Sequence, residues 1–316
     1  MQPFFSICIP VYKNIKYLDR LLQSIRIQTF NDYEVVVSDD SPDDTVEQFL
    51  KMNYADIPLA YYRNTKALGT PANWNFAIEK ATGTWIKLIH DDDWFASEDS
   101  LLLFSKAVAH SPAKFFHCNY SNVLLSNIAM SSQKIEGAAW RKKLIYSHPE
   151  ALYARNIIGP PSVTLVHHTV KAIYDTRMKW LVDIDFYMAV LRKEQANYIP
   201  ELLIKVGLGD EQVTQYTHNH PEIEIPEGLL LHSKLGDPAF KTWLYYDAWW
   251  RLMRNLKIRS LEQLSAFSND LTISGVLVKM LQHQSVLPLS LLQIGPFSKA
   301  SMFISWRLQL FAGRFK

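Results

Sequence analysis

The chain has 316 residues, and its 48% hydrophobic and 20% charged residues exclude a disordered or fibrous protein. Cys8 and Cys118 are its only cysteines, which excludes a disulfide scaffold and a zinc-finger-type site and is typical of a reducing compartment. The chain has 33 basic and 31 acidic residues. From Lys241 onward there are 10 basic and 3 acidic residues, so the C-terminal part is basic. The rest of the chain has 23 basic and 28 acidic residues and is acidic.

Strand-like and helix-like segments alternate over the first 125 residues. Residues 4–10 form an apolar run that ends at a proline, which predicts a buried strand. The apolar residues from Ile15 to Ile25 recur at helical spacing and predict an amphipathic helix. Further strands are predicted at residues 34–37, 59–62, 84–89 and 115–120, and further helices at 71–80 and 97–110. This alternation predicts an α/β fold with a mostly parallel, Rossmann-like sheet flanked by helices.

Polar clusters follow the predicted strands at one edge of this sheet. Residues 10–14 follow the first strand, Asp39 and Asp40 follow the second, and residues 91–93 follow the fourth. In parallel sheets, ligands bind beyond the carboxyl ends of the strands. We therefore expect the binding site at this edge.

Asp91, Asp92 and Asp93 are adjacent carboxylates, which repel one another unless a cation or a solvent-exposed loop accommodates them. A hard divalent cation such as Mn²⁺ or Mg²⁺ takes one or two carboxylates together with substrate phosphates. The alternative is an acidic cap in front of the helix predicted at residues 97–110.

Asp39 and Asp40, taken alone, are typical turn residues. Together with the second acidic cluster they also suit one site, where one cluster accepts hydrogen bonds from a nucleobase and the other holds a metal on phosphates. Gly69 and Gly83 are isolated glycines, so the sequence matches neither a P-loop nor a dinucleotide-binding fingerprint.

Beyond residue 120 the pattern is less regular. A loop is predicted at residues 159–162, and a helix is predicted to start within residues 180–187. From about Gly228 the chain is predicted to be mostly helical. One helical face there carries Trp243, Tyr246, Trp250 and Met253.

Four motifs occur together in the first 110 residues. They are residues 6–14, residues 28–30 with 33–41, residues 75–86, and residues 91–94. In order and spacing they resemble the family-2 glycosyltransferases, which use nucleotide sugars and have the GT-A fold. The resemblance implies a catalytic domain over residues 1–227, with a nucleotide-binding part over about 1–110 and an acceptor-binding part over about 111–227. A basic, aromatic-rich helical extension over residues 228–316 follows.

The resemblance also implies roles for residues at the predicted nucleobase site. Pro10, Val11 and Tyr12 correspond to the loop that encloses the base, and the Tyr12 ring could stack on it. Asp40 corresponds to the carboxylate that accepts the imide N–H of the base, which suits uracil or thymine. Asp39 lies beside it and holds the loop or the ribose.

For the diphosphate, the resemblance implies a divalent cation, Mn²⁺ or Mg²⁺, bound by the Asp-x-Asp arrangement of Asp91 and Asp93. Asp93 is the preferred direct ligand, and Asp91 and Asp92 are counted with the nucleotide-binding residues. The cation would stabilise the negative charge on the departing diphosphate without a general acid. Arg63 and Lys66 could offer further positive charge.

An inverting transferase needs a base on the opposite face of the sugar. Asp183 matches the place of the family's base at the start of a helix, and Asp185 is the second choice. Residues two apart on a helix point about 200° away from each other, so only one should face the site. Where the family often has a His that helps to bind metal or diphosphate, this chain has Gly209. His218 or His220 could substitute for it, and the alternative for each is an ordinary surface His.

The C-terminal residues predict a basic amphipathic helix. Ile304, Leu308, Phe311 and Phe315 lie at helical spacing, with Arg307, Arg314 and Lys316 between them. Such a helix can lie in a membrane interface, which suits a lipid-linked acceptor. Alternatively it packs its apolar face on the catalytic domain or on another subunit of a homo-oligomer. Nucleic-acid binding is not expected, since no motif for it accompanies the basic residues.

The sequence thus predicts an inverting, metal-dependent glycosyltransferase of hexosyl or N-acetylhexosaminyl type. It would move a sugar from a nucleoside-diphosphate sugar, with UDP preferred, to a hydroxyl of a glycan or lipid-linked saccharide in polysaccharide biosynthesis. A non-catalytic sugar-nucleotide-binding or scaffold protein of the same fold, or a nucleotidyltransferase, is the alternative. Without a predicted signal peptide or membrane span, we expect a cytoplasmic location, with peripheral contact at the inner face of the membrane.

Overall fold

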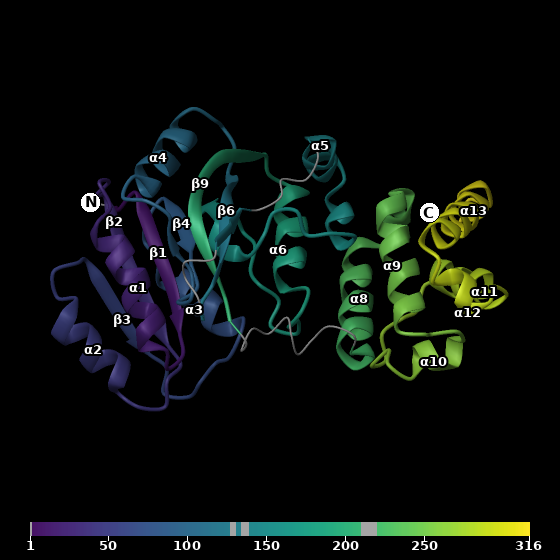
Figure 1. The fold of residues 1–316 in the computed structure, drawn as a ribbon, viewed down its shortest axis with the longest axis horizontal. Helices are drawn as coiled ribbons and strands as arrows, with labels where there is room; N and C mark the ends of the chain where they lie inside the picture. Colours follow the sequence, from purple (N-terminus) through teal and green to yellow (C-terminus); the bar gives the residue numbers. More distant parts are fainter. Residues whose placement is uncertain (1, 127–130, 134–138, 210–219) are drawn as a thin grey trace. The chain divides into compact units, whose positions relative to one another are not determined.

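The computed structural model describes residues 2–126, 131–133, 139–209 and 220–316 (Figure 1). The chain divides into two compact units, each assembled from separate stretches of sequence. Unit 1 comprises Met1–Ala138, Ile157–Thr176 and Ala189–Gln212, and unit 2 comprises Ala139–Asn156, Arg177–Met188 and Val213–Lys316.

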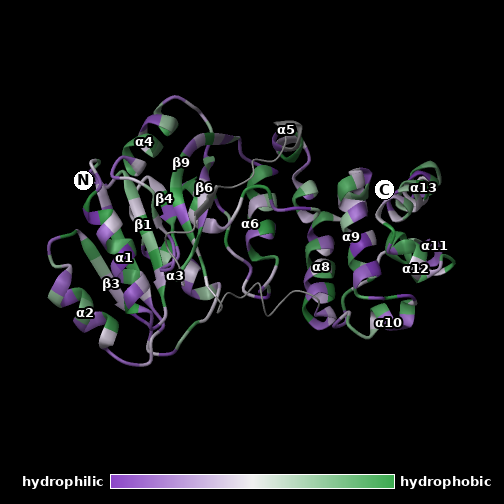
Figure 2. Ribbon diagram, viewed as in Figure 1, coloured by the Kyte–Doolittle hydropathy of each residue, from purple (hydrophilic) through white to green (hydrophobic). Residues whose placement is uncertain are grey.

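The first half of the sheet in unit 1 is parallel, as predicted. Its strands are β1 (Phe5–Val11), β2 (Tyr33–Asp39), β3 (Leu59–Arg63) and β4 (Trp85–Leu88), in the order β3-β2-β1-β4. Every residue of β1 is buried, because it lies between two neighbouring strands and under helices. Figure 2 shows hydrophobic residues along these strands and a mixture of hydrophilic and hydrophobic ones on helix α2 (Thr45–Asn53). The predicted α/β fold with a mostly parallel sheet is confirmed.

The second half of the sheet mixes strand directions. It contains β5 (Trp94–Phe95), β6 (Phe115–Leu124), β7 (Ser131–Gln133), β8 (Thr164–His167) and β9 (Ala196–Leu208). β8 runs antiparallel between β4 and β6, and β6 pairs in parallel with β9. The short β5 pairs antiparallel with β9, and the short β7 pairs antiparallel with β6. The 3₁₀ turn η2 (Pro161–Val163) leads into β8, at the predicted loop.

Helices α1 (Ile15–Arg26), α3 (Ala72–Lys80) and α4 (Ser100–Ala109) accompany the sheet together with α2 (Figure 1). The start of α1 is capped by Asn14, whose side chain accepts a hydrogen bond from the Tyr17 N–H. The apolar residues that predicted this helix face the core: Leu18, Leu22 and Ile25 are fully buried. The predicted elements of the first 120 residues are therefore confirmed to within a few residues.

Unit 2 is helical, as predicted for the C-terminal part. Its elements are α5 (Ala139–Ser147), η1 (Pro149–Tyr153), α8 (Pro221–Leu235), η3 (Asp237–Lys241), α9 (Trp243–Asn255), α10 (Leu261–Ser265), α11 (Gly275–Ser285), α12 (Leu289–Leu292) and α13 (Gly295–Phe311). Helix α6 (Val182–Leu191), predicted within residues 180–187, begins in this unit. Among the described residues, no helix is both long and apolar enough to cross a membrane.

Two expectations for these helices need correction. The buried side of α9 is wider than the predicted single face, since Tyr245 and Trp249 are fully buried while Trp243 is only half-buried. Phe315 does not continue the apolar face of α13, because the helix ends at Phe311 and Phe315 packs inward near Phe240.

Candidate active site

The carboxyl ends of β1, β2 and β4 lie side by side, because β2 and β4 both pair with β1. Val11 at the end of β1 is opposite Asp39 at the end of β2. On the other side, the Ile89 N–H donates to the Cys8 carbonyl just after β4 ends. The segments that follow these three strands therefore meet at one edge of the sheet, as predicted.

The segment after β1 presents an aromatic ring. Pro10 and Val11 are buried within β1, whereas the Tyr12 side chain is 56% exposed. Lys13 adopts a left-handed backbone conformation (φ 64°), which its N–H stabilises by donating to Ser41 Oγ at 2.8 Å. The turn leaves the Tyr12 ring open for stacking, with the Lys13 ammonium 4.8 Å from its centroid.

Asp40 holds the loop that follows β3. Its carboxylate accepts hydrogen bonds from the N–H groups of Leu68 (3.0 Å) and Gly69 (2.8 Å) and from the Asn64 amide (2.8 Å). Gly69 has φ 73°, a conformation that glycine adopts without strain. A carboxylate offers about four acceptor positions, and the described residues occupy three of them at Asp40.

Asp39 is fully buried and hydrogen-bonded within the same region. It accepts from the Tyr61 hydroxyl and from the Ser41 N–H, both at 2.8 Å. Arg63, at the end of β3, is exposed and donates to the Pro42 carbonyl at 3.1 Å, and Lys66 is exposed in the following loop.

Sequence reasoning missed Asn73, which is buried beneath this loop. Its side chain bonds to Ser38 Oγ, accepts from the Asn64 amide at 3.1 Å and donates to the Ser38 carbonyl at 3.1 Å. A buried Asn in the first turn of α3 was the available signal, since buried amides require several partners.

The acidic residues after β4 form a tight turn. The Asp93 N–H donates to the His90 carbonyl at 3.1 Å, and Asp93 Oδ1 accepts from the Gly207 N–H of β9 at 2.9 Å. Helix α4 begins at Ser100 with Asp99 as its N-cap, and β5 lies between, so the alternative of an acidic helix cap is wrong.

Within this turn, His90, Asp92 and Asp93 each bring one ligand atom within 4.8 Å of the others, a grouping that could hold a metal ion. Burial and the charge of Asp92 raise the pKa of Asp93 well above its usual range. Burial likewise raises the pKa of Asp91, which is not a member of this group, to about 8.

His90 was not recognised from the sequence. Its ring packs against Trp74 with centroids 4.7 Å apart, and the backbone N–H of His90 donates to Ser162 Oγ at 3.0 Å. The Nε2 atom is buried and has no hydrogen-bond partner among the residues that the structure describes. Burial and the nearby Lys87 lower the pKa of His90 to about 4, so the imidazole is neutral at pH 7.

Two basic residues accompany the acidic turn. The Arg20 guanidinium lies 3.9 Å from the centroid of the Trp94 ring and donates to the Asp92 carbonyl at 3.4 Å. Lys87 is fully buried and donates to the carbonyls of Ser162 and Thr164. Burial lowers the pKa of Lys87 to about 8.

Gly207 permits the close approach of β9 to this turn. A Cβ atom at that position would lie 2.4 Å from the Asp92 carbonyl oxygen, so only glycine fits. Gly209, where the family often has a His, follows β9 directly. Of its suggested substitutes, His218 lies outside the described residues, and His220 is exposed with Nδ1 3.1 Å from Glu222.

In unit 2, Asp183 and Asp185 lie in the first turn of α6 with different partners. Asp183 is half-buried and accepts from the Asn156 amide at 2.6 Å and from the Ile184 N–H at 2.8 Å. Burial raises its pKa to about 6. Asp185 is buried and forms an ion pair with Lys234 at 2.7 Å.

The segment before α6 is held by Glu227, a buried residue of α8 that sequence reasoning also missed. Its carboxylate accepts from the consecutive N–H groups of Lys179 (2.7 Å), Trp180 (2.9 Å) and Leu181 (2.8 Å). These charge-assisted bonds hold the segment that leads into α6.

The model of "Glycosyl transferase family 2" matches residues 6–156. Among curated relatives, an uncharacterized glycosyltransferase of Rickettsia typhi is 24% identical over 70% of this chain and 69% of its own length. The abequosyltransferase RfbV of Salmonella typhimurium is 33% identical over 36% of this chain and 35% of its own length. A GalNAc(5)-diNAcBac-PP-undecaprenol beta-1,3-glucosyltransferase of Campylobacter jejuni is 27% identical over 49% of each chain. The chain thus matches only part of the length of these relatives.

Two solved structures share the fold. TarS 1–349 of S. aureus in complex with UDP-GlcNAc has a TM-score of 0.61 and 15% identity over 98% of this chain and 92% of that one. The mannosyltransferase PcManGT of Pyrobaculum calidifontis, in complex with GDP-Man and Mn²⁺, has a TM-score of 0.55 and 14% identity over 98% of this chain and 87% of that one. Residues 6–156 of the chain thus match glycosyl transferase family 2, and its fold is that of these solved glycosyltransferases.

Proposed function

We propose that the protein is an inverting, metal-dependent transferase that moves a sugar from a UDP-linked donor to a hydroxyl of a glycan or lipid-linked saccharide. The observation that carries the proposal is the meeting of the segments after β1, β2 and β4 at one edge of the sheet. Tyr12, Asp40 and the acidic turn with Asp93 lie on these segments. Base, ribose and diphosphate of one nucleotide need such a row of groups.

For the nucleobase, the exposed Tyr12 ring supplies a stacking surface, and Asp40 retains one acceptor position for an imide N–H. Pro10 and Val11, buried at the end of β1, would lie beneath the base. Asp39 stabilises the adjoining segment by its hydrogen bond from the Tyr61 hydroxyl. A UDP donor is the proposal because uracil offers that N–H.

For the diphosphate, Asp93 and Asp92 would hold the divalent cation, with Asp91 beside them. The buried Nε2 of His90, which has no partner among the described residues, makes it a third candidate ligand. A set of carboxylates with one imidazole suits Mn²⁺ better than Mg²⁺, which prefers oxygen alone. When bound, the cation stabilises negative charge on the leaving diphosphate. Arg63 and Lys66 remain weaker candidates for contact with the phosphates.

For the acceptor, Asp183 takes the proton of the attacking hydroxyl while that oxygen bonds to the anomeric carbon and the nucleoside diphosphate departs. A pKa of about 6 leaves the carboxylate ionised at pH 7 but basic enough to accept the proton. Asp185 is the less suitable base, because Lys234 already neutralises it.

A lipid-linked acceptor is favoured by the Campylobacter relative, whose name specifies a PP-undecaprenol substrate. A lipid-linked acceptor would place the reaction at a membrane surface, and a cytoplasmic location at the inner face stays a prediction. The boundary between a catalytic domain over residues 1–227 and an extension over 228–316 stays a prediction, as does a homo-oligomer.

The test is release of UDP from a panel of UDP-sugars by the purified chain, with Mn²⁺ and with a chelator. We expect turnover that requires the metal and that Asp183→Asn reduces by at least about 10²-fold. Asp270→Asn, an exposed substitution in unit 2, serves as the control. Nucleotide-sugar binding without turnover would instead indicate the non-catalytic binding protein, and release of pyrophosphate would indicate a nucleotidyltransferase.

A further inference from the structure

Helix α13 turns a largely polar side toward the core of unit 2. Its buried residues are Ser298, Met302, Ser305 and Gln309. Ser305 Oγ lies 2.6 Å from the Tyr246 hydroxyl, and the Gln309 amide donates to the same hydroxyl at 2.7 Å. Buried polar groups with such partners are well tolerated, so the orientation of the helix is stabilised by hydrogen bonds.

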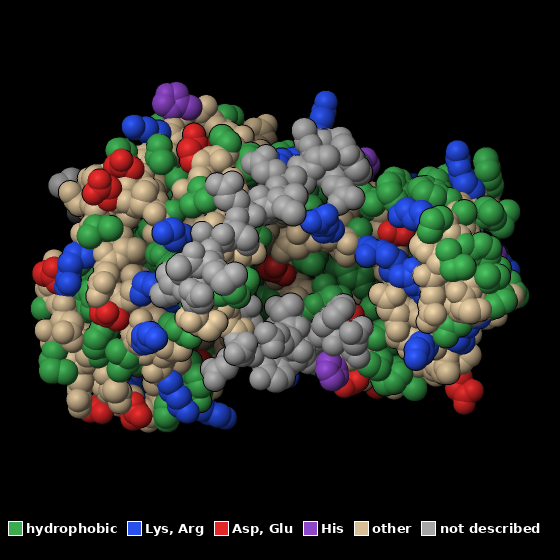
Figure 3. Space-filling model, viewed as in Figure 1, with side chains coloured by type: hydrophobic (Ala, Val, Ile, Leu, Met, Phe, Trp, Pro, Cys, Tyr) green, Lys and Arg blue, Asp and Glu red, His purple; other side chains and the backbone are tan. Residues whose placement is uncertain are grey.

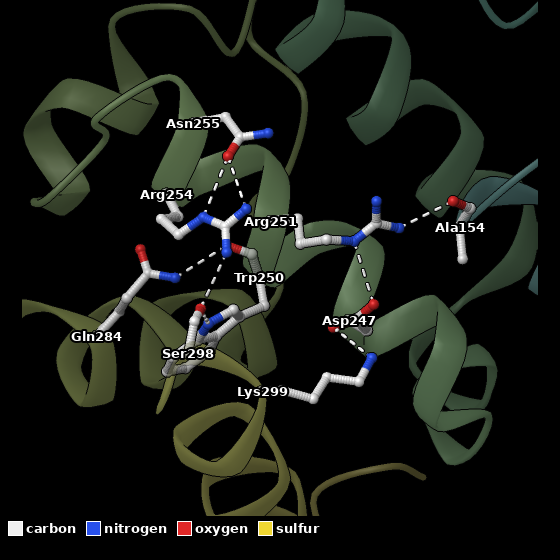
Figure 4. A network of polar contacts seen from close by, with 9 residues as sticks. All are labelled: Ala154, Asp247, Trp250, Arg251, Arg254, Asn255, Gln284, Ser298 and Lys299. Atoms are coloured by element: carbon white, nitrogen blue, oxygen red, sulfur yellow. Dashed lines mark hydrogen bonds and ion pairs between the residues drawn. The ribbon is translucent and has the colours of Figure 1, made fainter. Parts of the chain in front are cut away.

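The start of α13 is anchored on α9 (Figure 4). Ser298 Oγ accepts from the Trp250 indole and from the Arg254 guanidinium, both at 3.1 Å. Lys299 forms an ion pair with the buried Asp247 at 3.0 Å. These contacts leave the helix no freedom to rotate its polar side outward.

The opposite side of α13 is apolar and exposed. Ile304, Leu308 and Phe311 lie at positions i, i+4 and i+7 on one face, and they are 63%, 56% and 81% exposed. Hydrophobic side chains gather over the C-terminal helices in the space-filling view (Figure 3). This pattern is the reverse of a helix that packs its apolar side on a core, and contiguous exposed apolar patches mark interaction sites.

The charged side chains of α13 and of the residues after it are all basic. Arg307, Arg314 and Lys316 are exposed on or next to α13, and no acidic residue follows Asp270 in the sequence. A symmetric contact with a second copy would bring these cations against their equivalents, which is unfavourable. An apolar face with a basic border instead complements a bilayer surface that carries anionic headgroups.

We propose that the exposed face of α13, formed by Ile304, Leu308 and Phe311 and bordered by Arg307, Arg314 and Lys316, docks on anionic lipid bilayers. The apolar side chains enter the headgroup region and the basic side chains contact the anionic groups. This surface is separate from the residues to which nucleotide and metal binding were assigned, so it does not depend on the proposed reaction.

The test is flotation of the full chain with vesicles in which about one lipid in three is phosphatidylglycerol, compared with vesicles of phosphatidylcholine alone. We expect the chain to float with the anionic vesicles and to be released as salt rises. Leu308→Gln with Phe311→Gln should lower the bound fraction about tenfold or more. Arg307→Gln with Arg314→Gln should remove the preference for anionic lipid.

The matched control changes two equally exposed apolar residues of unit 1, Met52→Gln with Ile173→Gln, and should float like the wild type. Circular dichroism of each variant verifies that it is folded. Equal flotation of the wild type and the Leu308/Phe311 variant would overturn the proposal. So would failure of the wild type to float, or a dimer in light scattering that this variant dissociates.

Discussion

At the scale of single residues, the two carboxylates at the start of α6 show how surroundings assign chemistry. Asp183 accepts hydrogen bonds from neutral N–H groups, whereas Asp185 is neutralised by Lys234. The 200° separation expected on a helix predicted that only one would face a site, but it could not say which, because Lys234 lies 49 positions further along the chain. The partners, and not the spacing, make Asp183 the better base.

This difference predicts a pH dependence. Transfer requires ionised Asp183, so kcat should fall about tenfold for each pH unit below its pKa of about 6 and level off above it. A pH–rate profile at saturating donor and acceptor measures it. A profile that stays flat down to pH 5 would contradict the assignment. Because burial disfavours the charge, Asp183→Asn should leave the melting temperature unchanged or raise it while abolishing transfer.

The role of His90 can be tested by metal binding alone, without measuring enzyme turnover. If its imidazole joins Asp92 and Asp93 at the metal, His90→Ala should weaken Mn²⁺ binding about tenfold and reduce Mg²⁺ binding less. Isothermal titration with each metal in the presence of UDP measures this. His110→Ala, at the exposed end of α4, is the control. Equal Mn²⁺ affinity of the His90 variant and the wild type would remove His90 from the metal site.

At the scale of elements, α6 depends on a carboxylate from another helix. Glu227 on α8 accepts three consecutive backbone N–H groups before α6 begins. Sequence reasoning located the helix from its own residues but missed this contact, since nothing in residues 180–187 specifies a partner nearly 50 positions away. Contacts of this kind come from tertiary structure alone.

We predict that Glu227→Gln lowers the free energy of unfolding by about 1–3 kcal/mol, because an amide has one acceptor oxygen and a donor where N–H groups converge. Urea unfolding measures the change, and Glu222→Gln, an exposed residue in the first turn of the same helix, should be near neutral. If α6 is displaced, kcat should fall more than binding of the donor. A Glu227 variant with unchanged stability would mean that the segment is held by other contacts.

The elements that were predicted well from the sequence have an uninterrupted hydrophobic pattern, whereas those that were missed do not. β1 is a short continuous apolar run and α1 has one clear helical period, and their predicted bounds nearly match. β9 was missed because Pro200 and Gly207 interrupt its pattern, and its pairing with β6 contains register shifts. For α13 the apolar face was recognised except for Phe315. The direction of that face depends on the Tyr246 hydroxyl and the Trp250 indole on α9 and on the Val276 carbonyl on α11.

At the scale of the whole molecule, the two buried cysteines can be used to test whether unit 1 is folded. Cys8 and Cys118 belong to β1 and β6 and are both fully buried. Burial raises the pKa of the Cys8 thiol, which makes it still less reactive. The sequence predicted free thiols in apolar strands, and this prediction is confirmed.

We therefore expect a thiol reagent to label the native chain only through unfolding, and UDP with Mn²⁺ to slow labelling further by stabilising the folded state. Mass spectrometry of both cysteine peptides over time measures the rates. Labelling of either thiol as fast as that of a free cysteine, with or without nucleotide, would contradict the buried strands. Serum albumin's exposed thiol can serve as the reactive standard.

Gly207 in β9 lies so close to the turn after β4 that no larger residue fits there. A methyl group there would meet the carbonyl of Asp92, so even alanine would push β9 away from the turn after β4. The Asp93 carboxylate would then lose the N–H that orients it. In directed evolution of this enzyme, replacements at position 207 should survive only beside compensating changes in the turn, so the two sites are best randomised in one library.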